Sequence, residues 1–118
     1  MAGHVTGIGG IFFRAADPDA LAKWYAEHLG VPSFGPWPQA AAPSVFAPFQ
    51  ADTGYWPDEK QWMLNLRVEG LDALVARLDD AGIAVETRPD EWDAPETGRF
   101  ARIADPEGNT IELWEPPA

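Results

Sequence analysis

The sequence predicts an α+β domain built from two modules, each with the element order βαβββ. The first observation is an internal repeat: IFFRAADPDAL at residues 11–21 aligns without gaps with LNLRVEGLDAL at residues 64–74, an offset of 53. The second is a change from strand-like to helical spacing of apolar residues within each copy. The third is that a glycine and further strand-like segments follow each predicted helix. A length of 118 residues fits one domain, with module one at about 5–58 and module two at about 62–116.

The first module begins with a predicted strand at residues 7–14, GIGGIFFR, which carries large apolar side chains. A helix is predicted over 18–29, because Asp17 suits the N-cap position and Pro18 the first helical position. Apolar residues recur at helical spacing within it, and Gly30 suits a left-handed helix end. Together these signals predict a strand followed by an amphipathic helix.

The rest of the chain alternates between loops and short predicted elements. Residues 31–61 are rich in Pro, Gly and Ala, and SVFAPF at 44–49 is the best strand candidate among them. The second module is predicted to contain a strand at 62–68, a helix at 71–81, a strand at 83–87, an acidic loop at 88–98, and a hairpin of strands 99–104 and 110–115 around the turn DPEGN.

Composition excludes several classes of function. The chain has no cysteine, which excludes disulfides, thiolate metal sites and cysteine nucleophiles. Its formal charge of −11, from 19 acidic and 8 basic residues, makes nucleic acid a poor partner and favours a cationic ligand. No apolar run approaches the roughly 20 residues that cross a bilayer, and no basic leader is evident at the N-terminus. We therefore expect a cytoplasmic protein without a membrane or nucleic-acid partner.

Strand alternation places a mixed set of side chains on one face of the predicted sheet. The opposite face is aliphatic and suits the two helices. Apolar walls with a few polar groups are typical of ligand pockets. Trp56 and Trp62 flank an exposed loop and are predicted at the mouth of such a pocket, with Phe46 in the predicted strand 44–49. The mixed face is predicted to carry Ile8, Gly10, Phe12, Arg14, Met63, Asn65, Arg67, Thr110, Glu112 and Trp114.

Two stretches carry a resemblance to a known family. IFFRAADPDALAKWYAEHLG opens the first module, and DPEGNTIELWEP closes the second. With the paired βαβββ order, they resemble the vicinal oxygen chelate superfamily, the group of glyoxalase I, bleomycin-resistance proteins and extradiol dioxygenases. The resemblance covers nearly the whole chain. It implies that the two modules form a cup-shaped mixed sheet around a cavity, with helices on the outer face, and that the protein is a homodimer.

The resemblance also implies where a metal ion would bind. In metal-using members, the first and last strands of each module supply ligands to one divalent ion, which binds two neighbouring substrate oxygens. The matching positions here are Gly10, Met63, residues 44–46 and Glu112. Glycine has no side chain, methionine is a poor ligand for a hard ion, and residues 44–46 offer no carboxylate or imidazole. Because only Glu112 matches, we expect no metal or other cofactor.

Three functions stay open from these residues. The first is a glyoxalase/bleomycin-resistance-like protein that binds a small aromatic or cationic molecule without the usual metal site. The second is a metal-dependent lyase or dioxygenase with a displaced site, or metal-free chemistry with Glu112 as general base. The third is a non-catalytic structural homodimer. Arg14 either holds a substrate carboxylate, as the resemblance implies, or pairs with Glu112 or Glu115. Glu112 is the one candidate catalytic residue, and the predicted ligand-binding residues are Phe12, Arg14, Phe46, Trp56, Trp62, Met63, Asn65, Glu112 and Trp114.

Overall fold

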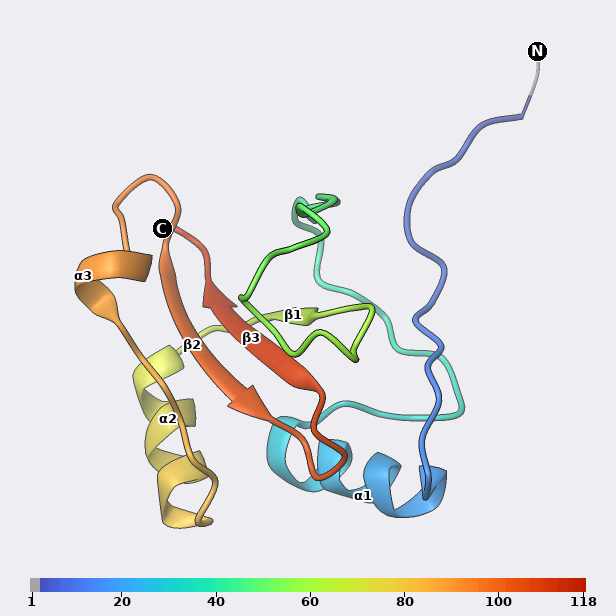
Figure 1. The fold of residues 1–118 in the computed structure, drawn as a ribbon. Helices are drawn as coiled ribbons and strands as arrows, with labels where there is room; N and C mark the ends of the chain where they lie inside the picture. Colours follow the sequence, from blue (N-terminus) through green and yellow to red (C-terminus); the bar gives the residue numbers. More distant parts are fainter. Residues whose placement is uncertain (1–2) are drawn as a thin grey trace.

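A computed structural model describes residues 3–118, which contain three helices and three strands (Figure 1). The strands form one mixed sheet in the order β1-β3-β2, with β1 parallel and β2 antiparallel to the central β3. The α+β class is therefore confirmed. Along the chain the elements are α1 (Pro18–Leu29), β1 (Leu64–Arg67), α2 (Leu71–Asp80), α3 (Pro89–Trp92), β2 (Arg99–Ala104) and β3 (Thr110–Glu115).

The helices and the hairpin follow the local signals of the sequence. The Asp17 carboxylate accepts a hydrogen bond of 3.1 Å from the Ala20 backbone N–H, which caps α1 at its start. Gly30 ends α1 with a φ of 66°, in the left-handed region that glycine tolerates best. The hairpin strands β2 and β3 span the predicted residues, and α2 ends one residue before its predicted limit.

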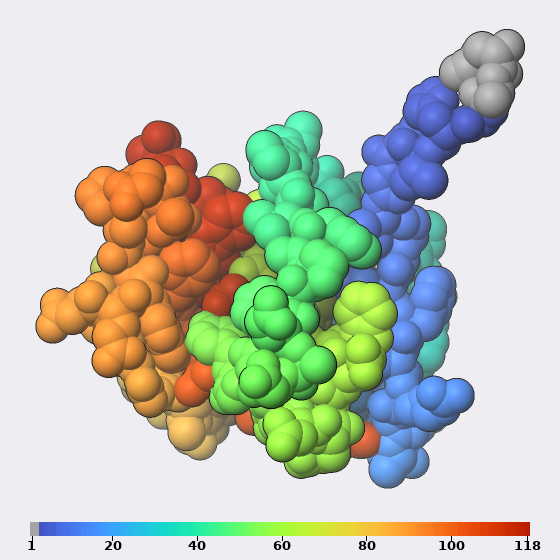
Figure 2. Space-filling view, turned by 45° about the horizontal axis from the view of Figure 1, so that its top comes forward, coloured from blue at the N-terminus to red at the C-terminus, as the bar shows by residue number. Residues whose placement is uncertain are grey.

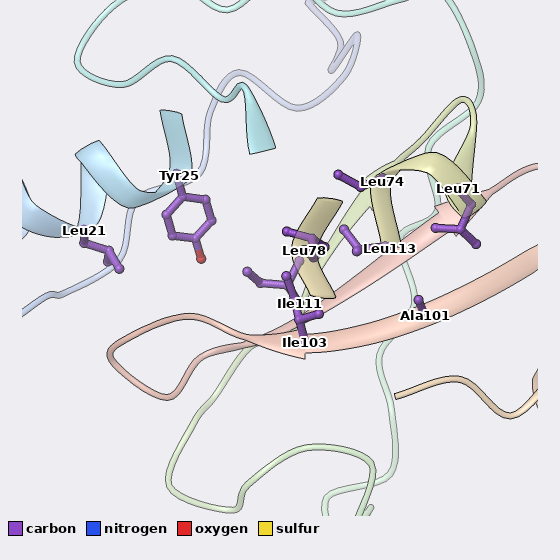
Figure 3. Packing of buried hydrophobic residues seen from close by; sticks show 9 residues of the cluster. All are labelled: Leu21, Tyr25, Leu71, Leu74, Leu78, Ala101, Ile103, Ile111 and Leu113. Carbon is purple, nitrogen blue, oxygen red and sulfur yellow. The ribbon is translucent and has the colours of Figure 1, made fainter. Parts of the chain in front are cut away.

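One face of the sheet packs against α1 and α2 to make the core. Ile111 and Leu113 of β3 alternate with polar residues, so both turn to the helices, and each is at most 1% exposed. Figure 3 shows the side chains of α1 and α2 converging on this face. The buried cluster consists of Leu21, Tyr25, Leu71, Leu74, Leu78, Ala101, Ile103, Ile111 and Leu113.

The predicted strands of the first module are not formed. Residues 7–14 and 44–49 pair with no strand, and among the described residues the second module supplies the whole sheet. The segment 83–87 makes only one bridge, from Glu86 to Arg102. A strand needs an adjacent edge for its backbone hydrogen bonds, and apolar alternation alone does not supply one. The outer edge of β1 is left unpaired, and the N-terminal segment extends away from the sheet (Figure 1).

The first module is attached to the sheet through the turn DPEGN. The buried Asp105 carboxylate accepts a 2.7 Å hydrogen bond from the Tyr25 hydroxyl of α1. The Glu107 carboxylate accepts from the backbone N–H groups of Ala16 and Asp17, at 2.6 and 3.0 Å. These contacts join residues 80 to 91 positions apart in the chain. The turn DPEGN thus links α1 and the residues before it to the sheet.

No helix within residues 3–118 has both the length and the apolar character that a membrane span requires.

Replacing Tyr25 with Phe should lower the free energy of unfolding by about 1.5–3 kcal/mol at neutral pH, because a hydrogen bond to a buried carboxylate is lost. Burial, with the Asp105 hydrogen bond, holds the pKa of Tyr25 above its ordinary range. Its contribution is therefore complete below about pH 10, the unfolded value, and is lost as pH rises further, by about 1.4 kcal/mol per pH unit.

Urea unfolding of the wild type and Tyr25→Phe at neutral pH and above pH 10 measures both effects. The difference between the two proteins should shrink above pH 10. An equal difference at every pH would contradict the assigned state of the Tyr25 hydroxyl.

Candidate ligand-binding site

The sheet face opposite the helices carries two rows of polar and aromatic side chains. Strand register places Asn65, Glu112 and Arg102 in one row across β1, β3 and β2. The neighbouring row contains Arg67, Trp114 and Phe100. We call these six residues the polar face. Because strand residues alternate, the same short strands build the core on one side and this face on the other.

Glu112 lies at the centre of the polar face and is held from two sides. The Tyr55 hydroxyl donates to its Oε2 at 2.6 Å, and the Asn65 side-chain amide donates to its Oε1 at 2.7 Å. Both neighbours are donors, so each carboxylate oxygen has a hydrogen-bond partner. The alternative in which Arg14 pairs with Glu112 or Glu115 is not realised among the described residues. Glu115 accepts instead from Arg99 and from the N-terminus of α2.

Tyr55 brings a loop of the first half of the chain onto this face. Burial raises the pKa of the Tyr55 hydroxyl above its ordinary range, and the hydrogen bond to Glu112 raises it further. The Arg102 guanidinium acts in the opposite direction. Figure 2 shows the green segment that contains Tyr55 lying over the sheet. The hydroxyl therefore stays protonated as a donor to Glu112 at neutral pH.

Arg67 holds a second loop at the edge of the polar face. Its guanidinium donates to the backbone oxygens of Ala40, Ala42 and Pro43 at 2.9 to 3.2 Å, and to the Ser44 hydroxyl at 3.3 Å. A planar group with five donors suits several carbonyl acceptors at once, and a lysine ammonium does not. This side chain therefore places the loop before residue 45 beside the sheet.

Trp114 and Phe100 form the aromatic part of the face. Their rings are nearly parallel, with centroids 6.4 Å apart. The Trp114 indole N–H donates to the Thr97 carbonyl at 2.7 Å. Gly98 makes this possible: it has a φ of 104°, and a Cβ there would lie 2.2 Å from the Glu115 carbonyl oxygen. The close turn thus fixes the orientation of the indole.

The structure brings some predicted ligand-binding residues together and leaves others apart. Asn65, Glu112 and Trp114 lie on the polar face. Trp56 lies in the loop next to Tyr55, where its indole N–H donates to the Lys60 carbonyl. Met63 is half-buried just before β1. Phe12, Arg14, Phe46 and Trp62 are exposed and lie outside the sheet, contrary to the predicted arrangement.

Tyr55 and Arg102 were not predicted as site residues. Alternation along the predicted strand 99–104 would have placed Arg102 beside Phe100 on the polar face, so a signal for it existed. Tyr55 lies in an aperiodic loop. No local pattern indicates that its hydroxyl reaches a residue 57 positions away.

The groups around Glu112 do not fit a divalent ion. Both Glu112 carboxylate oxygens accept hydrogen bonds, from Tyr55 and Asn65. Arg102, a cation, is the residue opposite Glu112 on the neighbouring strand β2. A hard divalent ion needs several oxygen or imidazole donors instead. Within residues 3–118, no group of three or more His, Asp or Glu side chains is placed to hold a metal.

A hollow of about 200 Å³ lies apart from Glu112, between α2, α3 and β2. Arg99 in its wall already donates to Asp72 at 2.6 Å and to Glu115 at 3.4 Å. The charges of this hollow are therefore paired with each other, and the polar face remains the better candidate site.

Comparison with known proteins assigns the family. Residues 10–114 match the family described as a glyoxalase-like domain. The chain belongs to this family. The resemblance to the vicinal oxygen chelate superfamily is thereby confirmed. No curated protein gives a significant match.

Two solved structures from Streptomyces sp. CB03234 are similar to this glyoxalase-like chain. The first is a glyoxalase/bleomycin resistance protein, with 40% identity over 44% of this chain and 42% of that one, and a TM-score of 0.33. The second is TnmS3, an antibiotic binding protein, with 27% identity over 95% of this chain and 97% of that one, and a TM-score of 0.57. The second similarity spans nearly the full length of both chains.

Replacing Arg67 with Lys should release the loop before residue 45, because one ammonium cannot reach the acceptors that the guanidinium reaches. If the free energy of local opening of this Ala-rich segment falls by about 1.4 kcal/mol, its rate of cleavage should rise about tenfold. Limited elastase proteolysis measures the rate. Arg77→Lys, in the last turn of α2, is the control. Equal cleavage of the two variants would contradict the role given to Arg67.

Proposed function

We propose that this glyoxalase-like protein binds a small aromatic, cationic molecule on the polar face and does so without a metal ion. The observation that carries the proposal is the Glu112 carboxylate, which lies on the same face as Trp114 and Phe100 and accepts hydrogen bonds from Tyr55 and Asn65. The similarity to an antibiotic binding protein over nearly the whole chain supports a binding function of this kind.

The chemistry of the face suits such a ligand. The carboxylate attracts a cation or a hydrogen-bond donor, and the chain's charge of −11 adds long-range attraction. Trp114 and Phe100 offer flat apolar surfaces next to the carboxylate. Ring faces stabilise both planar aromatic groups and cations. A planar aromatic cation would use both features at once.

The metal-dependent alternative, a lyase or dioxygenase with a displaced site, is less well supported. Its metal would need ligands that converge near Glu112, and the neighbours there are Tyr55, Asn65 and Arg102. The metal-free alternative, with Glu112 as general base, would use the same carboxylate, and the similarity to an antibiotic binding protein favours binding over catalysis. In a structural protein with no ligand, Glu112 would serve only as the acceptor that holds Tyr55 and Asn65.

The protein that binds this ligand is, in our proposal, a homodimer. Much of the first half of the chain exposes large apolar side chains, with Phe12 at 94% and Phe46 at 82%. Apolar patches of this kind mark interaction surfaces. The radius of gyration of 15.3 Å exceeds the roughly 13.5 Å of a compact chain of this length. A second copy would cover this surface and would offer residues 7–14, which pair with no strand of the described chain, a strand to pair with.

Titration with proflavine, a planar aromatic cation, tests the ligand proposal against anthraquinone-2-sulfonate, an anion of similar shape. Proflavine should bind more tightly, and Glu112→Gln should weaken its binding about 10- to 100-fold, as a lost charge-assisted contact predicts. Isothermal titration measures both affinities. Because no metal takes part in the proposal, EDTA should leave the affinity unchanged.

Glu115→Gln is the matched control, because Glu115 lies on the same strand but points to the helix side and caps α2. It should retain proflavine binding. Equal losses in both variants, or loss of binding in EDTA, would contradict the proposed site.

Sedimentation equilibrium tests the dimer, with an expected mass of about twice 12.9 kDa. Phe12→Asp should dissociate it, because a charge would be buried in the contact. Ala76→Asp is the control, because Ala76 is exposed on α2 and does not belong to the apolar surface of the first half of the chain. A wild type that sediments as a single chain would rule out the dimer, as would equal behaviour of the two variants.

A further inference from the structure

We propose that Arg102 is a positioning residue that holds the loop of Tyr55 across Glu112, and thereby sets how readily a ligand reaches the polar face. The inference rests on the proposed function for its ligand, but the position of the loop can be measured without one.

Arg102 links the sheet to the loop through its guanidinium. The Nη1 group donates to the Tyr55 backbone carbonyl at 2.8 Å. The Nε and Nη2 groups donate to Glu86 Oε1 at 3.2 and 2.6 Å. The Arg102 side chain is only 22% exposed. Because Glu86 is also bridged to β2 through its backbone, the guanidinium is oriented by a residue that the sheet itself fixes.

Two aromatic rings enclose the same guanidinium. Its carbon lies 4.9 Å from the Tyr55 ring centroid and 5.1 Å from the Trp92 ring centroid. The two rings meet edge to face with centroids 6.0 Å apart. Ring faces attract a guanidinium, so these partly buried cation–π contacts stabilise its position between the two rings. Arg102 therefore joins three separate segments: the loop, the bridge at Glu86 and helix α3.

Tyr55 connects Arg102 to Glu112, because its backbone and its side chain are each held by one of them. Arg102 binds the backbone carbonyl of Tyr55, and the hydroxyl of Tyr55 donates to Glu112. A cationic ligand that takes the Glu112 carboxylate must replace this hydroxyl. Each contact that Arg102 makes to Tyr55 opposes that replacement. Without Arg102, the loop of Tyr55 would move away from the polar face more often, and a ligand would reach the Glu112 carboxylate faster.

Spectroscopic titration of tyrosine in the absence of ligand distinguishes a positioning role from a purely local one. If Arg102→Gln releases the loop, one tyrosine should ionise near pH 10, the ordinary value. If the loop stays, loss of the nearby cation would raise the pKa of Tyr55 still further. The two possibilities thus change the pKa of Tyr55 in opposite directions. Absence of a tyrosine that titrates near pH 10 in Arg102→Gln would overturn the proposal.

Arg99→Gln is the matched control. Arg99 lies on the same strand, also contacts carboxylates, and is on the helix side. It should leave the tyrosine titration of the wild type unchanged. Glu86→Gln is the second variant in case Arg102→Gln fails to fold. It should release the loop in part, because it weakens the orientation of the guanidinium without removing it.

Stopped-flow mixing with proflavine then measures the ligand step. We expect the association rate to rise about tenfold in Arg102→Gln and to stay unchanged in Arg99→Gln. If the tyrosine titration shows release but proflavine binds to no variant, the positioning role stands and the proposed function fails. If the wild type binds proflavine while neither the titration nor the rate responds to Arg102→Gln, the inference fails and the proposed function stands.

Discussion

The packing of α1 against the sheet depends on the hydrogen bonds that the Asp105 carboxylate accepts. Its Oδ1 accepts from the backbone N–H groups of Glu107 and Asn109, and its Oδ2 accepts from the Asn109 amide and the Tyr25 hydroxyl. A single side chain thus closes the turn between β2 and β3 and ties α1 to it. A buried charge is costly unless its lone pairs are satisfied, and here four donors satisfy them. The same turn sets the register that places Glu112 between Asn65 and Arg102.

The central strand β3 follows this turn and has a different role on each face of the sheet. Ile111 and Leu113 bury their side chains against the helices, while Glu112 and Trp114 face the loops that cover the sheet. Glu115 ends the strand by accepting from the first N–H groups of α2. The packed core and the proposed binding face are therefore separated by the alternation of one strand. A substitution on the recognition side leaves the packed side in place, so binding and folding can be tested separately.

Local signals in the sequence were sufficient for the parts of the fold that local chemistry decides. Asp17, Pro18 and Gly30 defined α1, and the turn residues of DPEGN defined the hairpin. The strands of the first module were predicted from the same kind of pattern and are not formed, because pairing depends on an edge elsewhere. For the site, alternation placed Asn65, Glu112 and Trp114 on one face. Tyr55 could not be found this way, since its contact joins an irregular loop to a distant strand.

The loop that crosses the polar face adds little to the buried core, against which only its first residue, Val31, is packed. None of the nine core residues comes from residues 31–61, although this segment supplies Tyr55 and the acceptors of Arg67. Substitutions in the segment therefore carry a small penalty in folding while they alter what lies over Glu112. Surface loops on a fixed scaffold are where proteins vary most freely. If the polar face binds the proposed ligand, ligand preference is an easily evolved trait, because selection can reshape the loop without disturbing the packing that keeps the protein folded.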